Sequence, residues 1–220
     1  MSDYKFSLGL QIFSLDKDDP VPVSDGLKKV FGSYAHLYHL YPDDLRRLYS
    51  DDMDDYSDES DFHEVSGIFE VRTERVSARV HLANLRRWQA CLKLLRKANW
   101  ECSLDMWMYV PVGRDLKRKL MTFYDDYGYE MRYIFDIEEE EFEIEYYHGN
   151  LGIKFRGLST RDIDGSIYRL KMNILLIDAI LQYCGSRSRD ELSEETWSDF
   201  KDSISNRELL SYLSHIRSRY

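Results

Sequence analysis

Apolar and polar residues alternate in several stretches of the chain, and a period of two predicts β-strands. At the start, Phe6, Leu8, Leu10 and Ile12 alternate with small or polar residues. The strands predicted in this way cover residues 6–12, 68–80, 100–110, 129–135, 142–146 and 151–155. The apolar parity of the second stretch changes near residues 73–75, which predicts a bulge or a tight hairpin there.

Apolar residues three or four positions apart predict helices between these strands. The predicted helices cover residues 24–41, 43–49, 84–98, 114–127, 159–184 and 188 onward. The helix at 159–184 has the widest apolar stripe, so we expect it to be the buried core helix. Capping boxes are predicted at Ser159 with Asp162, at Ser188 with Glu191 and at Ser205 with Glu208, and the last one predicts a break near Ser205.

The order of these elements favours an α+β fold. We predict a largely antiparallel mixed sheet, built from the N-terminal strand, the central strands and a C-terminal meander. Helices cover this sheet, and two C-terminal helices follow it. No Pro-, Gly- or Ser-rich linker divides the chain, so residues 1–220 are predicted to form a single domain. Residues 50–64 lack apolar periodicity and are rich in like charges, which predicts an exposed acidic loop.

Composition excludes several classes of protein. Hydrophobic residues make up 43% and charged residues 32% of the 220 residues, which is typical of a globular chain rather than a disordered one. The longest apolar run, residues 174–181, is interrupted by Asp178 and is far shorter than the ~18 residues of a membrane helix. The first residues lack a basic and then apolar leader, so we predict a cytoplasmic protein without a membrane partner.

The three cysteines, Cys91, Cys102 and Cys184, are widely spaced and form no CxxC pair. We therefore expect buried free thiols rather than disulfides or a zinc site.

Charge is distributed in blocks along the chain. Residues 42–65 hold 10 acids and 2 bases, residues 66–120 hold 5 acids and 12 bases, and residues 121–145 hold 10 acids and 1 base. The formal net charge is −10, which disfavours general binding to duplex DNA, because such binding relies on Lys and Arg against phosphate. Tyrosine is unusually frequent, at 17 residues, and is often placed among the acids.

The short motifs of common catalytic and metal sites are missing from the sequence. His36 and His39 lie on the predicted helix 24–41 with Asp43 and Asp44 beyond, but the pattern does not match HExxH. The Asp-rich loop fails the EF-hand pattern, since its twelfth position, counted from Asp52, is His63. We therefore predict no catalytic residue, no metal and no cofactor.

The predicted helix 84–97 carries five cations on its polar face: Arg86, Arg87, Lys93, Arg96 and Lys97. One interpretation is a contact with nucleic acid. The other is a solvated face that pairs with the acidic strands, and the sequence leaves both open.

The feature of the sequence that does indicate a function is the interleaving of tyrosine with Asp and Glu. Spaced carboxylates can copy the charge pattern of nucleic-acid phosphates, and tyrosine adds rigid contact area. This predicts a non-enzymatic acidic protein that occludes a basic, nucleic-acid-binding surface of a nuclease, toxin or defence complex. Anti-defence, anti-CRISPR and toxin-neutralising immunity proteins are similar to it in this general character. The predicted partner-binding residues are Asp51, Asp52, Asp54, Asp55, Tyr56, Asp58, Glu59, Glu130, Asp136, Glu141, Glu143, Glu145 and Tyr147.

Two other classes stay open. An enzyme acting on nucleotides or nucleic acid would use a cluster such as Asp136, Glu143 and His148. A structural or assembly protein would use its acids for solubility. The sequence leaves the oligomeric state open as well.

Overall fold

The computed structural model describes residues 4–14, 21–40, 67–98, 104–123, 144–147 and 150–217. Within these residues, seven strands form one antiparallel sheet in the order β2-β3-β1-β5-β7-β6, and the short β4 pairs with β1. The strands are β1 (Lys5–Ser14), β2 (Ala35–Leu40), β3 (Gly67–Thr73), β4 (Val76–Ser77), β5 (Leu104–Pro111), β6 (Ile144–Tyr147) and β7 (Asn150–Leu158). The predicted antiparallel α+β architecture is confirmed.

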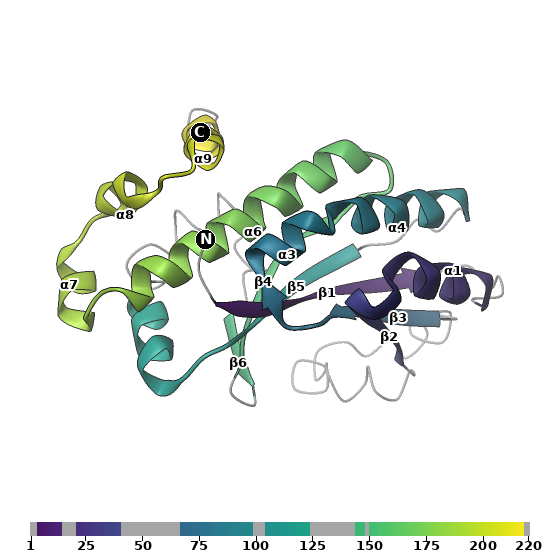
Figure 1. The fold of residues 1–220 in the computed structure, drawn as a ribbon, viewed down its shortest axis with the longest axis horizontal. Helices are drawn as coiled ribbons and strands as arrows, with labels where there is room; N and C mark the ends of the chain where they lie inside the picture. The colour runs from purple at the N-terminus through teal and green to yellow at the C-terminus, as the bar shows by residue number, and fades with distance from the viewer. Residues whose placement is uncertain are drawn as a thin grey trace, which may run out of the picture.

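The helices follow the strands in a pattern close to the predicted one. They are α1 (Val21–Phe31), the 3-10 turn η1 (Gly32–Tyr34), α3 (Ala78–Ala83), α4 (Leu85–Lys97), α6 (Ile163–Gly185), α7 (Arg189–Glu194), α8 (Trp197–Ser203) and α9 (Arg207–Arg217). Residues 114–123 are also helical. Figure 1 shows α1, α3, α4 and α6 on one side of the sheet, with α7 to α9 trailing from the end of α6. None of the described helices is both long and apolar enough to cross a membrane.

The core lies between the sheet and this layer of helices. Phe6, Leu8, Leu10 and Ile12 of β1 are all fully buried, as the alternation predicts. Helix α6 packs over the strands with an unbroken buried run from residue 172 to residue 178. The prediction that this helix forms the core is confirmed.

The other face of the sheet has a polar and aromatic character. The side chain of Glu70 accepts from the Nε of Arg72 at 2.8 Å, and the Arg72 guanidinium lies 4.5 Å from the centre of the Tyr109 ring. Gly9 lies beneath Tyr109, where a Cβ would come within 2.9 Å of the ring. A side chain at position 9 would therefore displace the ring that holds this charged pair.

His81 of α3 links three elements inside the core. Its Nε2 donates to the backbone carbonyl of Phe6 at 2.9 Å, and its Nδ1 accepts from the hydroxyl of Tyr34 at 2.7 Å. The neutral ring protonated at Nε2 satisfies both contacts. Burial lowers the pKa of His81 to about 4 and raises the pKa of Tyr34 to about 12.

Two of the predicted elements are wrong in their type. The helix predicted over residues 24–41 is the shorter α1, followed by η1 and strand β2. Gly32 interrupts the helix with a φ of 54°, and residues 35–40 then pair with β3. Likewise, the strand predicted to reach residue 80 ends at Ser77, where α3 begins.

The strand predictions near the C-terminal half are confirmed in part. Strand β6 pairs with β7 in antiparallel register, as the meander requires, and β5 joins the other edge of β7. The first predicted strand of the meander, residues 129–135, and the predicted helix at 43–49 lie outside the described residues.

The helix caps are shifted from their predicted positions in two of three cases. Asp162 alone caps α6, because its Oδ1 accepts from the backbone N–H of Gly165 at 3.0 Å. Asn206 caps α9 in place of Ser205, with its Oδ1 accepting from Leu209 at 3.0 Å. The capping box of Ser188 with Glu191 is present as predicted.

Candidate functional site

A cavity of about 610 Å³ lies beside the C-terminal half of α6. One wall is the face of α6 that carries Leu175, Asp178 and Gln182, and another wall is the linker between α8 and α9, with Ile204 and Asn206. This volume falls within the range of about 300–1,000 Å³ that is typical of pockets for small ligands.

The chain forms this cavity because α9 turns back and packs against α6. The Lys171 ammonium of α6 donates to both carboxylate oxygens of Glu208 in α9, at 2.6 and 2.5 Å. The rings of Tyr168 and Tyr212 meet edge to face at 5.9 Å between centroids. These contacts hold α9 against α6, and the residues just before α9 line the cavity together with Leu175 and Asp178 of α6.

Asp178 is the buried carboxylate of the cavity wall, with an exposed fraction of 3%. It interrupts the most apolar stretch of the chain, within the buried run of α6. The side-chain amide of Gln182, one turn later, donates to its Oδ2 at 2.8 Å. Placing a carboxylate in such surroundings costs several kcal/mol unless hydrogen bonds or a cation compensate it.

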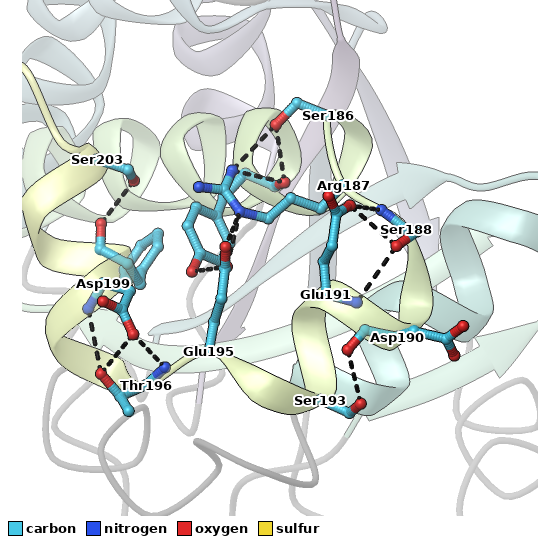
Figure 2. Close-up of polar contacts among 12 residues, drawn as sticks. Ser186, Arg187, Ser188, Asp190, Glu191, Ser193, Glu195, Thr196, Asp199 and Ser203 are labelled. Carbon is cyan, nitrogen blue, oxygen red and sulfur yellow. Dashed lines mark hydrogen bonds and ion pairs between the residues drawn. The ribbon is translucent and has the colours of Figure 1, made fainter.

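The second charged group of the cavity wall is Arg187, just beyond the end of α6. Its Nε donates to both carboxylate oxygens of Glu195, at 2.8 and 2.7 Å, and its guanidinium lies 3.6 Å from the centre of the Tyr183 ring. The Tyr183 hydroxyl also donates to Glu195, and Ser186 accepts from Arg187 at 3.1 Å. Figure 2 shows how these side chains converge between the end of α6 and the start of α8.

Tyr4 contributes to the cavity from the other end of the chain. Its hydroxyl lies against Gly185, where a Cβ would overlap it. Glycine at this position therefore allows the N-terminal residues to approach the end of α6 and to line the cavity.

Several exposed acids near the cavity stabilise helix starts. Glu191 accepts from the backbone N–H and the hydroxyl of Ser188, and these bonds lower the pKa of Glu191. Asp199 accepts from the hydroxyl and the backbone N–H of Thr196, which lowers the pKa of Asp199 in the same way. The Thr196 box, visible in Figure 2, was not among the predicted caps.

Most of the predicted partner-binding residues lie outside the described residues. These are Asp51, Asp52, Asp54, Asp55, Tyr56, Asp58, Glu59, Glu130, Asp136, Glu141 and Glu143. The backbones of Glu145 and Tyr147 lie in β6 and pair with Gly152 and Asn150 of β7. Their role in binding stays a prediction.

The described strands nevertheless fix where the two acidic blocks join the fold. Residues 41–66 connect β2 to β3, and Leu40 at the end of β2 is paired with Ile68 at the start of β3. The second acidic block leads into β6, at the opposite end of the strand order. The two blocks are therefore attached at opposite ends of this sheet.

The basic helix predicted at 84–98 is α4, and its cations have two environments. Arg87 is half-buried and donates to the backbone carbonyls of Val30 and Phe31 at the end of α1. The other four, Arg86, Lys93, Arg96 and Lys97, are exposed. These four form no ion pair with any residue in the described part of the chain.

The two histidines considered as metal ligands lie on strand β2 rather than on a helix. Their backbones lie three residues apart on one strand, so the HxxH spacing on a helix that the metal hypothesis required is not present. His36 instead contacts Glu74, with 2.5 Å between its Nε2 and Oε1. Among the described residues, no group of three or more His, Cys, Asp or Glu side chains could hold a metal ion.

The cavity residues were missed by the sequence analysis. Asp178 was visible as an acid within an apolar run, but the packing of α9 and Tyr4 around it depends on tertiary contacts.

No protein-family model, curated protein or solved structure matches this chain.

Proposed function

We propose that the protein is a non-enzymatic acidic binding protein that occludes a basic, nucleic-acid-binding surface of a partner protein. The partner class is a nuclease, a toxin or a defence complex, and the site of action is the cytoplasm. The acidic, tyrosine-containing segments supply the contact, with Glu141, Glu143 and Glu145 as the central acids.

The distribution of charge between the fold and its connections carries this proposal. The described residues include 25 Lys and Arg against 16 Asp and Glu, although the whole chain has a net charge of −10. The acidic surplus therefore belongs to the remaining segments, mainly residues 41–66 and 124–143. Segments of high like charge create local potentials that steer a partner of opposite charge.

The ion pairs within the described residues support the same interpretation. Glu70, Glu195 and Glu208 each contact a Lys or Arg of the described fold, at 2.8 Å or less. The positive charges of Arg72, Lys171 and Arg187 are therefore balanced by carboxylates of the described fold. The proposal requires that the charge of the acidic blocks is not fully compensated by the other cations of the fold.

Charge reversal at Glu141, Glu143 and Glu145 tests the proposal. The triple Lys variant should lose binding to the basic partner, while its melting temperature stays within a few degrees, because exposed pairs contribute only about 0–1 kcal/mol each. A pull-down from cell extract identifies the partner, and its displacement from nucleic acid is then measured with the purified proteins at increasing salt.

A matched control carries the same change of charge at a different place. Asp190, Glu194 and Asp202 are exposed acids of α7 and α8, outside the predicted site. Their triple Lys variant should retain binding and should still displace nucleic acid from the partner. Equal loss in both variants would show an effect of net charge alone, and full binding by the folded Glu141, Glu143 and Glu145 variant would exclude the proposed face.

A further inference from the structure

We infer that the outer face of α4 binds the phosphate backbone of double-stranded nucleic acid through a row of three cations, Arg86, Lys93 and Lys97, which we call the basic ridge. The sequence left open whether the cations of this helix contact nucleic acid or pair with the acidic strands. The inference is independent of the proposed function, because none of the ridge residues belongs to the acidic blocks.

The spacing of the three cations places them along one line of the helix. At about 100° per residue, positions i, i+7 and i+11 lie within about 40° of one another. The buried side chains of α4, among them Trp88 and Leu92, lie on the opposite side. All three ridge cations are exposed, and a rise of about 1.5 Å per residue makes the ridge about 16 Å long.

The helices next to α4 lie at the flanks of the ridge. Arg87 donates to the backbone at the end of α1 on one flank. Gln89 donates to Asp164 of α6 at 3.2 Å on the other flank. Figure 1 shows α4 between these two helices, on the side of the helical layer that faces away from the sheet. The ridge is therefore part of the outer surface of this layer.

The described residues offer these cations no acidic partner. Residues 75–98 hold seven Lys and Arg and no Asp or Glu. The three ridge cations, together with the exposed Arg79 and Arg96, form no ion pair within the described part of the chain. The net charge of −10 disfavours binding of nucleic acid by the whole surface, but exposed charges act mainly within a Debye length of about 10 Å. The local positive charge thus decides what this face attracts.

The lack of exposed apolar groups on α4 favours a phosphate backbone over an acidic protein. The centre of a protein interface is enriched in aromatic side chains and depleted in lysine. The large hydrophobic side chains exposed in the described residues are Tyr38, Val80 and Tyr168, and none of them belongs to α4. Single strands are disfavoured for the same reason, because their bases stack on exposed aromatic rings. A duplex needs only cations along its phosphates, and about five base pairs match the length of the ridge.

Fluorescence anisotropy of a labelled DNA duplex of about 20 base pairs, titrated with the full-length protein, measures this binding. We expect a dissociation constant of about 10 µM at about 0.1 M NaCl. The affinity should fall with salt, with a slope of about −3 or steeper in a double-logarithmic plot, because each cation that contacts a phosphate releases a counterion. The separated strands of the same DNA should bind more weakly.

A triple variant removes the charge of the ridge and retains residues that favour a helix. Arg86→Gln, Lys93→Gln and Lys97→Gln together should weaken binding of the duplex at least tenfold. The salt slope should become shallower by about 3, since three phosphate contacts are lost. The melting temperature should stay within a few degrees of that of the parent protein, because the three side chains are exposed.

A matched control removes three positive charges elsewhere. Its substitutions are at exposed arginines outside α4: Arg114→Gln, Arg118→Gln and Arg189→Gln. This variant should bind the duplex as the parent protein does. Equal loss of affinity in the two folded variants would overturn the inference, because net charge alone would then explain the binding.

Three other outcomes would overturn the inference as well. The first is an unchanged affinity in the folded ridge variant, and the second is a parent protein that does not bind the duplex even at low salt. The third is a different occupant: tighter binding of the single strands, or polyglutamate that competes as well as unlabelled duplex at equal charge, would show that the ridge does not select a duplex backbone.

Discussion

Single buried residues determine how α6 holds the core together. Ile174 is fully buried in the middle of the run that packs on the sheet. Ile174→Asp both removes a packed side chain and buries a charge, so we expect a loss of at least about 4 kcal/mol in the free energy of unfolding. Urea unfolding monitored by circular dichroism measures this loss.

The conservative variant Ile174→Val provides the comparison, with an expected loss of about 0.5–1.5 kcal/mol. An Asp variant as stable as the Val variant would contradict the buried position of α6.

His81 makes the stability of the fold depend on pH. Burial lowers its folded-state pKa to about 4, below the usual value of about 6.5, so the unfolded chain binds the proton more readily between these values. The stabilisation is fully present above about pH 6.5 and is lost as the pH falls toward 4, by about 3 kcal/mol. Urea unfolding at several pH values measures this dependence.

Other groups titrate over the same range, so the comparison needs a variant without this histidine. In His81→Gln the side chain does not titrate, and the loss between pH 7 and pH 4 should be smaller by the same amount. Parallel stability curves for the two proteins would show that His81 is not the group responsible.

At the scale of elements, the connection between β2 and β3 can be shortened. Leu40 and Ile68 are paired, so the connection starts and ends at neighbouring points of the sheet. We expect deletion of residues 51–61 to change the melting temperature by no more than a few degrees, because these acidic residues repel one another and offer little apolar surface. Insoluble or unfolded protein after this deletion would show that the segment supports the fold.

The sequence correctly predicted those elements in which the spacing of apolar residues within the segment is enough to determine the secondary structure. The alternation in β1 and the apolar stripe of α6 both placed buried residues correctly. It failed at residues 35–40, because helical spacing continues through Tyr34 and Leu37 while pairing with β3 decides the structure. It also failed at residues 78–80, where three alternating positions were too short a pattern to distinguish strand from helix.

The candidate cavity could not be predicted from the sequence, for a different reason. Its walls come from Tyr4, the end of α6 and the linker before α9, which are separated by most of the chain. Of the cavity residues, only Asp178 was noticeable in the sequence, as one acid within an apolar helix. The burial of its side chain depends on tertiary packing and cannot be derived from the spacing of residues in the sequence.

At the scale of the whole molecule, the described fold and the acidic segments have opposite charge. The four exposed cations of α4 are among the groups of the fold that an acidic segment or an anionic partner could contact. The organisation of residues 1–220 as a single domain stays a prediction.

The central place of β1 has a consequence for how the chain folds as it is synthesised. Strand β1 precedes every other described strand, yet its partners β3, β4 and β5 all come later, up to Pro111. The middle of the sheet therefore cannot be completed until β5 has left the ribosome, and α6, which packs over the strands, is synthesised later still. Chains of this kind depend on long-range pairing for their nucleus, so they fold slowly and need protection from aggregation while they are incomplete.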